Sequence, residues 1–365
     1  MTVTSLNLTS SPVQLSADLI DIESPSHHEQ EIADAIFDAL SRIDGAETAR
    51  IKNTVLARTN RGLGSRVILA GHIDTVPLAD NTPHRLSDGI LHGCGAVDMK
   101  TGLAVYLNAF ATLAASEDLT REITLVCYEG EEVSTEYNGL GFVESELPDW
   151  LTGDVALLGE PSGGIIEAGC QGTIRVRVTA LGTRAHSARA WLGENAAHLL
   201  APVLTRINEY EPRRVTIDGC EYREGINVVK LDSFVATNTI PDSAEMLVNF
   251  RFAPDRSVED AMAHLNEVLG EQASISVEVD DVAAAALPGL SQPAAAELVA
   301  AVGGEFRAKF GWTDVSRFST LGIPAVNFGP GDPGYAHKPD EQCPVDQITH
   351  VADVLRTFLT SSNKG

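Results

Sequence analysis

The chain is poor in positive charge. Its 365 residues include 26 Lys and Arg but 51 Asp and Glu, which gives a formal net charge of −25 at pH 7. This balance argues against nucleic acid or an anionic membrane as a partner, because both would repel an acidic protein. An anionic small substrate stays compatible with it, since a binding site can carry its own local cations.

Cysteine and long apolar runs are also scarce. The five cysteines are scattered and form no CxxC pair, which favours reduced thiols over a disulfide framework. No apolar run approaches the roughly 20 residues of a bilayer-spanning helix. The opening segment "MTVTSLNLTSSPVQL" has neither the basic nor the apolar region of a secretory signal. We therefore expect a cytoplasmic protein without a membrane partner.

Short apolar runs dominate the first part of the chain. "RVILAG", "EITLVCYEG" and "DVALLGEP" alternate with stretches such as "TGLAVYLNAFATLAAS", which has the composition of a helix. Continuous apolar runs between helices indicate a parallel or mixed sheet that is buried on both faces. Nearer the N-terminus, Ser26 and Glu29 have capping-box spacing ahead of a helical apolar period, which predicts a helix capped by Ser26.

The pattern changes at about residue 173. "TIRVRVTALG" alternates strictly, as a half-exposed antiparallel strand does. The segments that follow, including a helix at "GENAAHLLAPVLTRINEY", complete a βαββαβ series, the order of a ferredoxin-like unit. We therefore predict a discontinuous α/β domain, residues 1–172 and 284–365, with an α+β ferredoxin-like domain of residues 173–283 inserted into it.

Acidic and histidine side chains follow apolar runs or lie in glycine-rich turns in five segments. These residues are His72 and Asp74 in "ILAGHIDTVP", Asp98 in "GCGAVDMKTG", Glu131 and Glu132 in "YEGEEV", Glu160 in "LLGEP" and His337 in "GPGDPGYAHKPDE". Ligands of open α/β sheets bind beyond the carboxyl ends of the strands, where such segments can converge. Histidines with carboxylates suit zinc or a similar ion, and one carboxylate can bridge two ions about 3.5–4 Å apart.

Each of these residues alone has a structural explanation. His72 could be an ordinary buried or loop histidine, Asp98 could cap the following helix, and Glu160 could simply end a strand. The coincidence of five such segments in one chain favours a metal site over five separate explanations.

The motifs "GHIDTVP", "GCGAVDMKTGLAV", "YEGEEV", "LGEP" and "AHKPDE", in this order, resemble the dinuclear-zinc family of acylases, exopeptidases and deacylases. The resemblance covers nearly the whole chain. It implies a zinc-exopeptidase-like catalytic domain with an inserted lid and dimerisation domain. It also implies two Zn²⁺ per subunit, the second site being open to Co²⁺ or partial occupancy. His72, Asp98 and Glu160 would hold one ion, and His337, Glu132 and the bridging Asp98 the other.

The resemblance assigns further roles. Asp74 would orient His72 by accepting its second ring N–H, and Glu131 would be the general base. His186 occupies the position of the family's lid histidine, although by itself it could be a surface histidine. Arg251 and Asn238 would bind the substrate, whereas without the resemblance Arg251 could lie on a solvated strand face.

The family members that the chain most resembles remove succinate from N-succinyl-LL-2,6-diaminopimelate in lysine and diaminopimelate biosynthesis. This implies a small anionic acylamino acid as substrate and a homodimer formed through the inserted domain. Deacetylation of N-acetylornithine, or hydrolysis of another acylamino acid or a dipeptide, is the alternative, because Cys170 and Gln171 replace an arginine pair of many such members. A non-catalytic metal-binding dimer agrees less well with Glu131, since metal binding alone requires no base.

Overall fold

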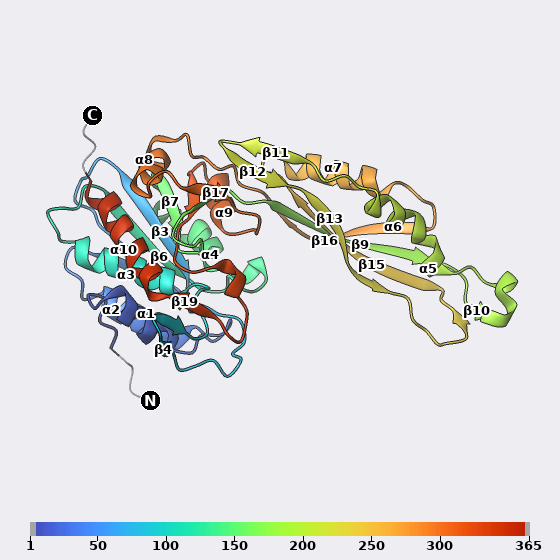
Figure 1. Cartoon of the computed structure of the whole chain (residues 1–365), viewed down its shortest axis with the longest axis horizontal. Helices are drawn as coiled ribbons and strands as arrows, with labels where there is room; N and C mark the ends of the chain where they lie inside the picture. The colour runs from blue at the N-terminus through green and yellow to red at the C-terminus, as the bar shows by residue number, and fades with distance from the viewer. Residues whose placement is uncertain (1–4, 362–365) are drawn as a thin grey trace. The chain divides into compact units, whose positions relative to one another are not determined.

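The computed structural model describes residues 5–361, which form two compact units (Figure 1). The first unit extends to Ala168 and resumes over Gly289–Arg307 and from Arg317 onward, and the second comprises Gly169–Pro288 and Ala308–Ser316. The expected boundaries at 172/173 and 283/284 differ from these by a few residues. Residues 308–316, expected in the catalytic part, cluster with the second unit instead.

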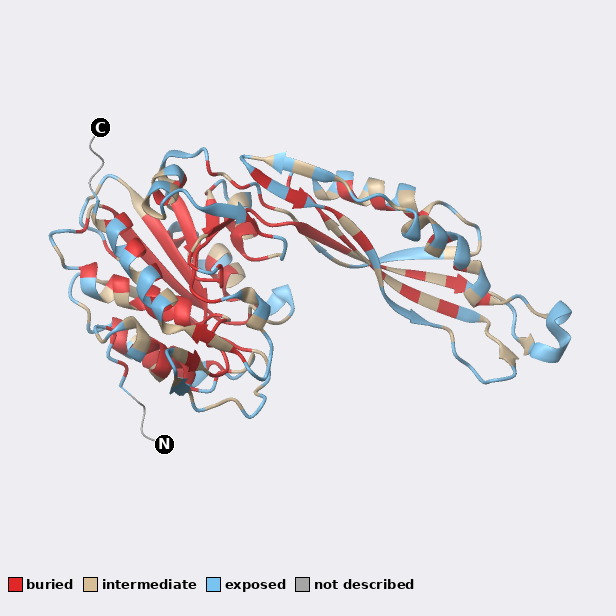
Figure 2. Cartoon of the chain, viewed as in Figure 1, coloured by how far each residue is buried: buried red, intermediate tan, exposed pale blue. Residues whose placement is uncertain are grey.

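The first unit is built on an eight-stranded mixed sheet. Its strand order is β1 (Glu47–Ile51), β2 (Thr54–Arg58), β6 (Glu122–Tyr128), β3 (Arg66–His72), β7 (Val155–Leu158), β18 (Ala325–Asn327), β8 (Ile166–Ala168) and β17 (Phe306–Ala308). The four strands β6, β3, β7 and β18 are neighbours and run parallel. Every residue of β6 and β7 is buried (Figure 2). The prediction of a mixed sheet buried on both faces is confirmed.

Helices and a small sheet complete this unit. The helices are α1 (Pro12–Ile20), α2 (Gln30–Leu40), α3 (Lys100–Leu113), α4 (Gly139–Glu146), α8 (Pro293–Ala301), α9 (Val315–Thr320) and α10 (Val345–Thr360), and the small sheet pairs β4 (Arg85–Ser87), β5 (Ile90–His92) and β19 (Gln342–Pro344). Helix α3 approaches the end of β7 so closely that a Cβ on Gly102 would lie 1.9 Å from the carbonyl oxygen of Gly159. Only glycine permits this contact, which brings the start of α3 to the end of β7.

The predicted N-terminal cap of α2 is wrong. The helix begins at Gln30, its N-cap residue is Glu29, and no side chain caps it. The Ser26 hydroxyl instead donates to Asp74 Oδ2 at 2.8 Å. Capping-box spacing identified a real helix, but a long-range acceptor binds the serine.

The second unit contains a four-stranded antiparallel sheet. Its order is β13 (Gly225–Asp232), β15 (Ser243–Phe252), β9 (Gly172–Leu181) and β16 (Ile275–Ala283), with helices α5 (Ala196–Leu199), α6 (Ala201–Asn208) and α7 (Val258–Leu269) between the strands in sequence. This is the predicted ferredoxin-like arrangement. The helix expected at "GENAAHLLAPVLTRINEY" is divided into α5 and α6, because Pro202 lacks the N–H that a continuous helix would direct to His198.

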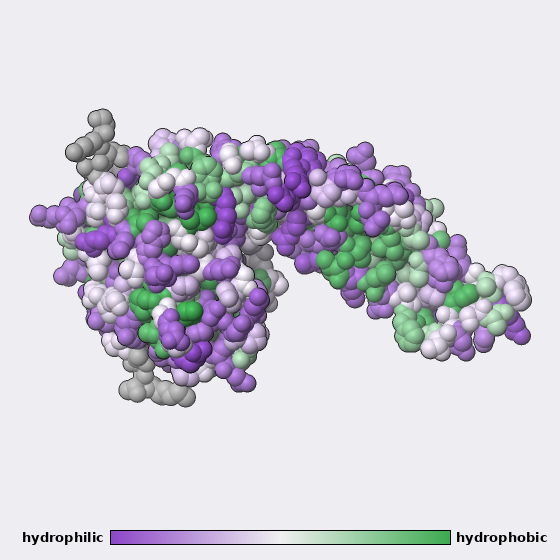
Figure 3. Space-filling model, viewed as in Figure 1, coloured by the Kyte–Doolittle hydropathy of each residue, from purple (hydrophilic) through white to green (hydrophobic). Residues whose placement is uncertain are grey.

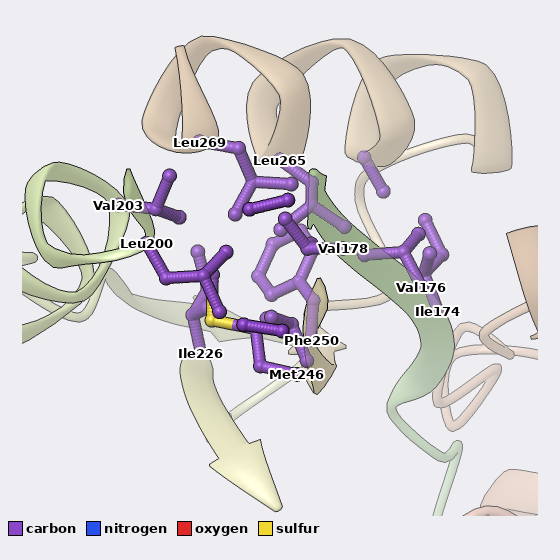
Figure 4. Packing of buried hydrophobic residues seen from close by; sticks show 14 of the residues in the cluster. Ile174, Val176, Val178, Leu200, Val203, Ile226, Met246, Phe250, Leu265 and Leu269 are labelled. Atoms are coloured by element: carbon purple, nitrogen blue, oxygen red, sulfur yellow. The ribbon is translucent and has the colours of Figure 1, made fainter. Parts of the chain in front are cut away.

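Alternation on β9 builds the core of this unit. Ile174, Val176 and Val178 are buried beneath α6 and α7 (Figure 4). The opposite face of the sheet is polar, and Arg177 pairs there with Glu245 at 2.7 Å. The strand is therefore half-exposed, as its sequence predicts.

Candidate metal centre

The candidate site lies where four neighbouring parallel strands of the first unit end. His72 is the last residue of β3, Glu131 and Glu132 follow β6, Glu160 follows β7, Asp98 precedes α3, and His337 lies in the segment after β18. Because parallel strands end at one edge of the sheet, residues far apart in the sequence meet there. His72, Asp98 and Glu132 offer donor atoms that all lie within 4.8 Å of one another, a group that could hold a metal ion.

The ring of His72 has a defined hydrogen-bonding direction. Its Nδ1 lies 2.9 Å from the main-chain carbonyl of Asp74, and the Asp74 carboxylate is farther away at 3.5 Å. A carbonyl can only accept, so in the neutral ring Nδ1 carries the proton and Nε2 has the lone pair. The carbonyl, rather than the expected carboxylate, is thus the nearer acceptor of the ring N–H.

The lone pair of His72 Nε2 faces carboxylates. Asp98 Oδ1 lies 3.1 Å from it and Glu160 Oε1 3.9 Å. A lone pair and an anionic oxygen repel each other at such distances unless a proton or a metal cation lies between them. This donor set therefore fits a divalent cation.

Asp98 presents its two oxygens to two different histidines. Oδ1 faces His72, whereas Oδ2 lies 3.4 Å from Nε2 of His337. The same His337 nitrogen is 3.0 Å from Glu132 Oε1. His337 has a left-handed φ of 62°, a conformation that few non-glycine residues adopt. Asp98 therefore has one oxygen in each of two adjacent donor sets.

The charges at the site shift the pKa of its members. Burial lowers the pKa of His72, but its hydrogen bonds with Asp74 and Asp98 outweigh this and hold the pKa well above the usual value. The hydrogen bond with Asp98 raises the pKa of His337 to about 9. Burial raises the pKa of Glu132. A metal ion must displace protons from these groups, because ligands bind in their deprotonated forms.

Asp74 anchors the segment that follows β6. It is fully buried, and its carboxylate accepts the backbone N–H of Glu131 through Oδ1 and that of Glu132 through Oδ2, each at 3.1 Å. The Ser26 hydroxyl adds a third donor. Burial disfavours the carboxylate, but the hydrogen bonds with His72 and with these amides leave the pKa of Asp74 below its usual value. Ser26 is a site residue that the sequence did not reveal, because its spacing indicated a helix cap.

The first glutamate of the "YEGEEV" segment has a structural role. Glu129 is buried, and its Oε1 accepts the backbone N–H of Asn53 at 2.9 Å. It therefore ties the end of β6 to the turn before β2, whereas Asp74 holds the backbone of Glu131 and Glu132, and Glu132 Oε1 lies 3.0 Å from His337 Nε2.

The remaining predicted residues lie in the second unit. His186 belongs to β10 (Ala185–His186), which pairs with β14 (Thr239–Ile240), and the Ser187 N–H donates to the Asn238 carbonyl at 2.9 Å. This ribbon brings His186 and Asn238 together. His186 Nδ1 accepts from the Ala188 N–H, so the neutral ring carries its proton on Nε2.

Arg251 lies apart from that ribbon, on β15 opposite Thr173 and Gly225. Burial, together with the nearby Arg175, lowers the pKa of its half-buried guanidinium. Within the part of the chain that the structure describes, no carboxylate lies within ion-pair distance of Arg251. Gln171, at one of the positions that depart from the family pattern, donates to the Arg223 carbonyl at 2.7 Å.

The fold and the donor cluster define a metallopeptidase-like α/β protein with an inserted domain. Residues 68–361 match the family described as Peptidase family M20/M25/M40, and the chain belongs to that family. It is 57% identical over 360 residues to a Corynebacterium glutamicum protein named succinyl-diaminopimelate desuccinylase, covering 97% of this chain and 98% of that one.

Solved structures of other proteins have the same fold. A tripeptidase from Staphylococcus aureus superposes with a TM-score of 0.78 at 20% identity, covering 98% of this chain and 99% of that one. A Bacillus subtilis protein described as a dinuclear metal-binding peptidase of family M20 gives a TM-score of 0.68 at 15% identity, with 96% of each chain covered. Among the described residues, no helix is long and apolar enough to cross a bilayer.

Proposed function

We propose that the chain is a metal-dependent amide hydrolase that removes succinate from N-succinyl-LL-2,6-diaminopimelate. The observation that carries the hydrolase assignment is Asp98, whose two oxygens face His72 and His337 separately. The succinyl substrate rests on the near-full-length similarity to the Corynebacterium glutamicum protein named for that activity.

Two zinc ions per chain fit the donor set. His72, Asp98 and Glu160 would hold one ion, and His337, Glu132 and Asp98 the other, the second site being the one that could also take Co²⁺ or be partly filled. Histidine nitrogens and carboxylate oxygens are common zinc ligands. When bound, such ions polarise an amide carbonyl and lower the pKa of a water molecule from about 15.7 to about 7.

Glu131 would be the general base. Its backbone is held by Asp74, and its charge contributes to the raised pKa of His72, so its carboxylate acts on the cluster electrostatically. In this role Glu131 removes the proton from the attacking water and returns it to the leaving amine, which is otherwise too basic to depart. Glu132, its neighbour, is directed at His337 instead.

The second unit would bind the substrate. The N–H on Nε2 of His186 can donate to the oxyanion that develops during attack on the amide. Arg251 is a half-buried cation suited to a substrate carboxylate, and Asn238 can donate an amide N–H to the same substrate. These three residues are the donors through which an acidic chain can bind an anionic acylamino acid.

A homodimer formed through the second unit is part of the proposal. Strand β13 is an edge of its sheet and carries exposed Val229 and Leu231, and Phe234 beyond it is 77% exposed. Figure 3 shows hydrophobic surface on this unit among hydrophilic residues. An exposed apolar edge strand is suited to pairing with a second copy.

We also propose a cytoplasmic location. All five cysteines are free and buried, in keeping with a reducing compartment.

A hydrolysis panel with zinc-loaded protein tests the substrate. We expect kcat/KM for N-succinyl-LL-2,6-diaminopimelate to exceed that for N-acetylornithine, other acylamino acids and dipeptides by a wide margin. Equal or reversed values would assign the protein to the alternative substrates of the same chemistry. No hydrolysis of any amide by the metal-loaded chain would contradict the hydrolase assignment.

A further inference from the structure

Glu341 binds the backbone of the loop that carries Asp98. Its Oε1 accepts the N–H groups of Val97 and Asp98, each at 2.9 Å, and its Oε2 accepts that of Gly95 at 3.0 Å. The Glu341 carbonyl accepts a further N–H from Gly93 at 3.2 Å. Only 2% of the residue is exposed, so the loop amides replace the water that would otherwise solvate this carboxylate.

The surrounding strands keep these contacts in register. Strand β19 begins at Gln342 and pairs with β5, Gln342 lying opposite His92. The loop that carries Asp98 therefore begins at the end of β5, next to Glu341. Gly95 has a left-handed φ of 81°, the conformation that directs its N–H to the same carboxylate as those of Val97 and Asp98. A buried carboxylate that accepts three amides defines one loop conformation.

The orientation of Asp98 depends on that conformation. Its carboxylate is useful to two donor sets only if Oδ1 faces His72 while Oδ2 faces His337. His337 itself lies four residues before Glu341, on the same segment. The segment of residues 337–341 therefore supplies His337 to the donor cluster. Through Glu341 it also holds the loop that carries Asp98, the residue shared by the two donor sets.

We propose that Glu341 is a positioning residue of the metal centre, which acts by fixing the backbone of residues 95–98 so that Asp98 serves both donor sets. The inference rests on the proposed function only in requiring that the cluster binds metal. It assigns Glu341 an effect on metal affinity, whereas a residue that merely satisfied a buried loop would affect stability alone.

Metal affinity in three variants tests this assignment. Glu341→Ala removes all three acceptors, and Glu341→Gln keeps Oε1 for Val97 and Asp98 but turns an amide N–H toward Gly95. Asp340→Asn, at the exposed neighbouring carboxylate, removes the same charge and is the control. Zinc dissociation constants come from competition with a chromophoric chelator, and backbone amide exchange of Gly95, Val97 and Asp98 is measured in the metal-free proteins.

We expect Glu341→Ala to weaken zinc binding about 10- to 100-fold, the usual effect of losing a residue that supports a ligand, and Glu341→Gln to weaken it less. Amide exchange of the three residues should accelerate in the same order, while Asp340→Asn stays native. If Glu341→Ala does not fold, Glu341→Gln decides alone. Native zinc affinity in variants whose exchange or thermal unfolding has changed would overturn the inference and leave the proposed function standing. A wild-type chain that binds no zinc would overturn both.

Discussion

Asp74 Oδ1 accepts the backbone N–H of Glu131 at 3.1 Å across 57 residues of sequence. The same residue accepts the ring N–H of His72 through its main-chain carbonyl. Asp74 therefore orients the ring of His72 at the end of β3. It also fixes the backbone of Glu131 and Glu132, which follow the neighbouring strand β6. It links the histidine to the glutamate that we propose as the base, without facing the donor cluster itself.

Weakening this link should reduce turnover while metal is retained. In Asp74→Asn an amide N–H would face one of the two backbone N–H groups that the carboxylate now accepts, so the acidic segment must shift. We expect kcat/KM to fall by about 10- to 100-fold, as for other residues that support a metal site, with the zinc content measured by elemental analysis unchanged.

Ser26 provides a milder test of the same link. Ser26→Ala removes the hydroxyl that donates to Asp74 at 2.8 Å, a charged hydrogen bond worth about 1.5–3 kcal/mol. We expect a smaller fall in kcat/KM than in Asp74→Asn, and Ser26→Thr, which keeps a hydroxyl, should recover part of it. Native activity in Ser26→Ala would mean that the two backbone amides hold Asp74 by themselves.

The adjacent glutamates should fail in different ways. Glu131→Gln cannot accept a proton, so kcat should fall by several orders of magnitude while fold and zinc binding persist. Glu132→Gln should chiefly weaken zinc binding, because Glu132 Oε1 is the group that meets His337 at 3.0 Å. Near-native turnover in Glu131→Gln would contradict its role as base.

Removing metal should abolish activity, and the two donor sets should separate by mutation. We expect chelators to inactivate the protein and zinc to restore it. His337→Ala should lower the zinc content from about two to about one per chain, since His72, Asp98 and Glu160 remain. Zinc affinity should fall as pH is lowered, because the raised pKa of His72 and the pKa of about 9 at His337 make protons stronger competitors. Full activity in metal-free protein would exclude this account.

The sequence predicts for a physical reason that these acidic and histidine side chains come together. Strand ends are signalled by buried apolar runs, and parallel strands must finish at one edge, so residues such as His72 and Glu160 are found without knowing a single contact. The same pattern predicts the ferredoxin-like unit, because alternation and helix periodicity are local properties.

Supporting residues are harder to predict. Ser26 and Glu341 act through hydrogen bonds to residues 48 and about 245 positions away, and no local periodicity marks such pairs. Local signals even mislead, since the spacing of Ser26 and Glu29 satisfies the capping-box rule while Asp74 binds the hydroxyl. Contacts between residues so far apart in the sequence become visible only in the three-dimensional structure.

The second unit should lose stability in acid through Glu224. Its side chain is buried, and Oε1 accepts from Arg213, Arg256 and the Ala253 N–H at 2.8–3.1 Å. Burial raises its pKa, but these donors outweigh that effect and leave the pKa below its usual value. A lowered pKa in the folded state stabilises the fold above the unfolded-state pKa of about 4.3, and the stabilisation is lost as pH falls through the folded value.

Glu224→Gln should therefore be destabilised at pH 7 by about 1.5–3 kcal/mol, the range for a charged hydrogen bond, and the difference from wild type should shrink as the pH falls below 4. Urea unfolding at several pH values measures this. Glu221→Gln is the matched control, because Glu221 is half exposed and pairs with Arg223 on the surface. Equal pH dependence in Glu224→Gln and wild type would contradict the linkage.

The final prediction concerns which chain uses His186. The residue lies in the second unit, on the β10–β14 ribbon, and its Nε2–H is free to donate once Nδ1 has accepted from Ala188. If the proposed homodimer places this N–H over the metal centre of its twin, each active site combines Glu131 of one chain with His186 of the other. The alternative is that His186 serves its own chain or no active site.

Mixing two inactive variants separates these cases. His186→Ala and Glu131→Gln are combined after reversible dissociation, and random pairing makes half of the dimers mixed. In a mixed dimer, one site receives Glu131 from the first variant and His186 from the second, while the other site lacks both. One intact site in half of the dimers corresponds to about a quarter of native activity, which follows from two-fold symmetry. If His186 acts within its own chain, every site keeps one defect and mixing restores nothing, so that result, with subunit exchange verified by mass-labelled chains, would rule out the role in the partner's site.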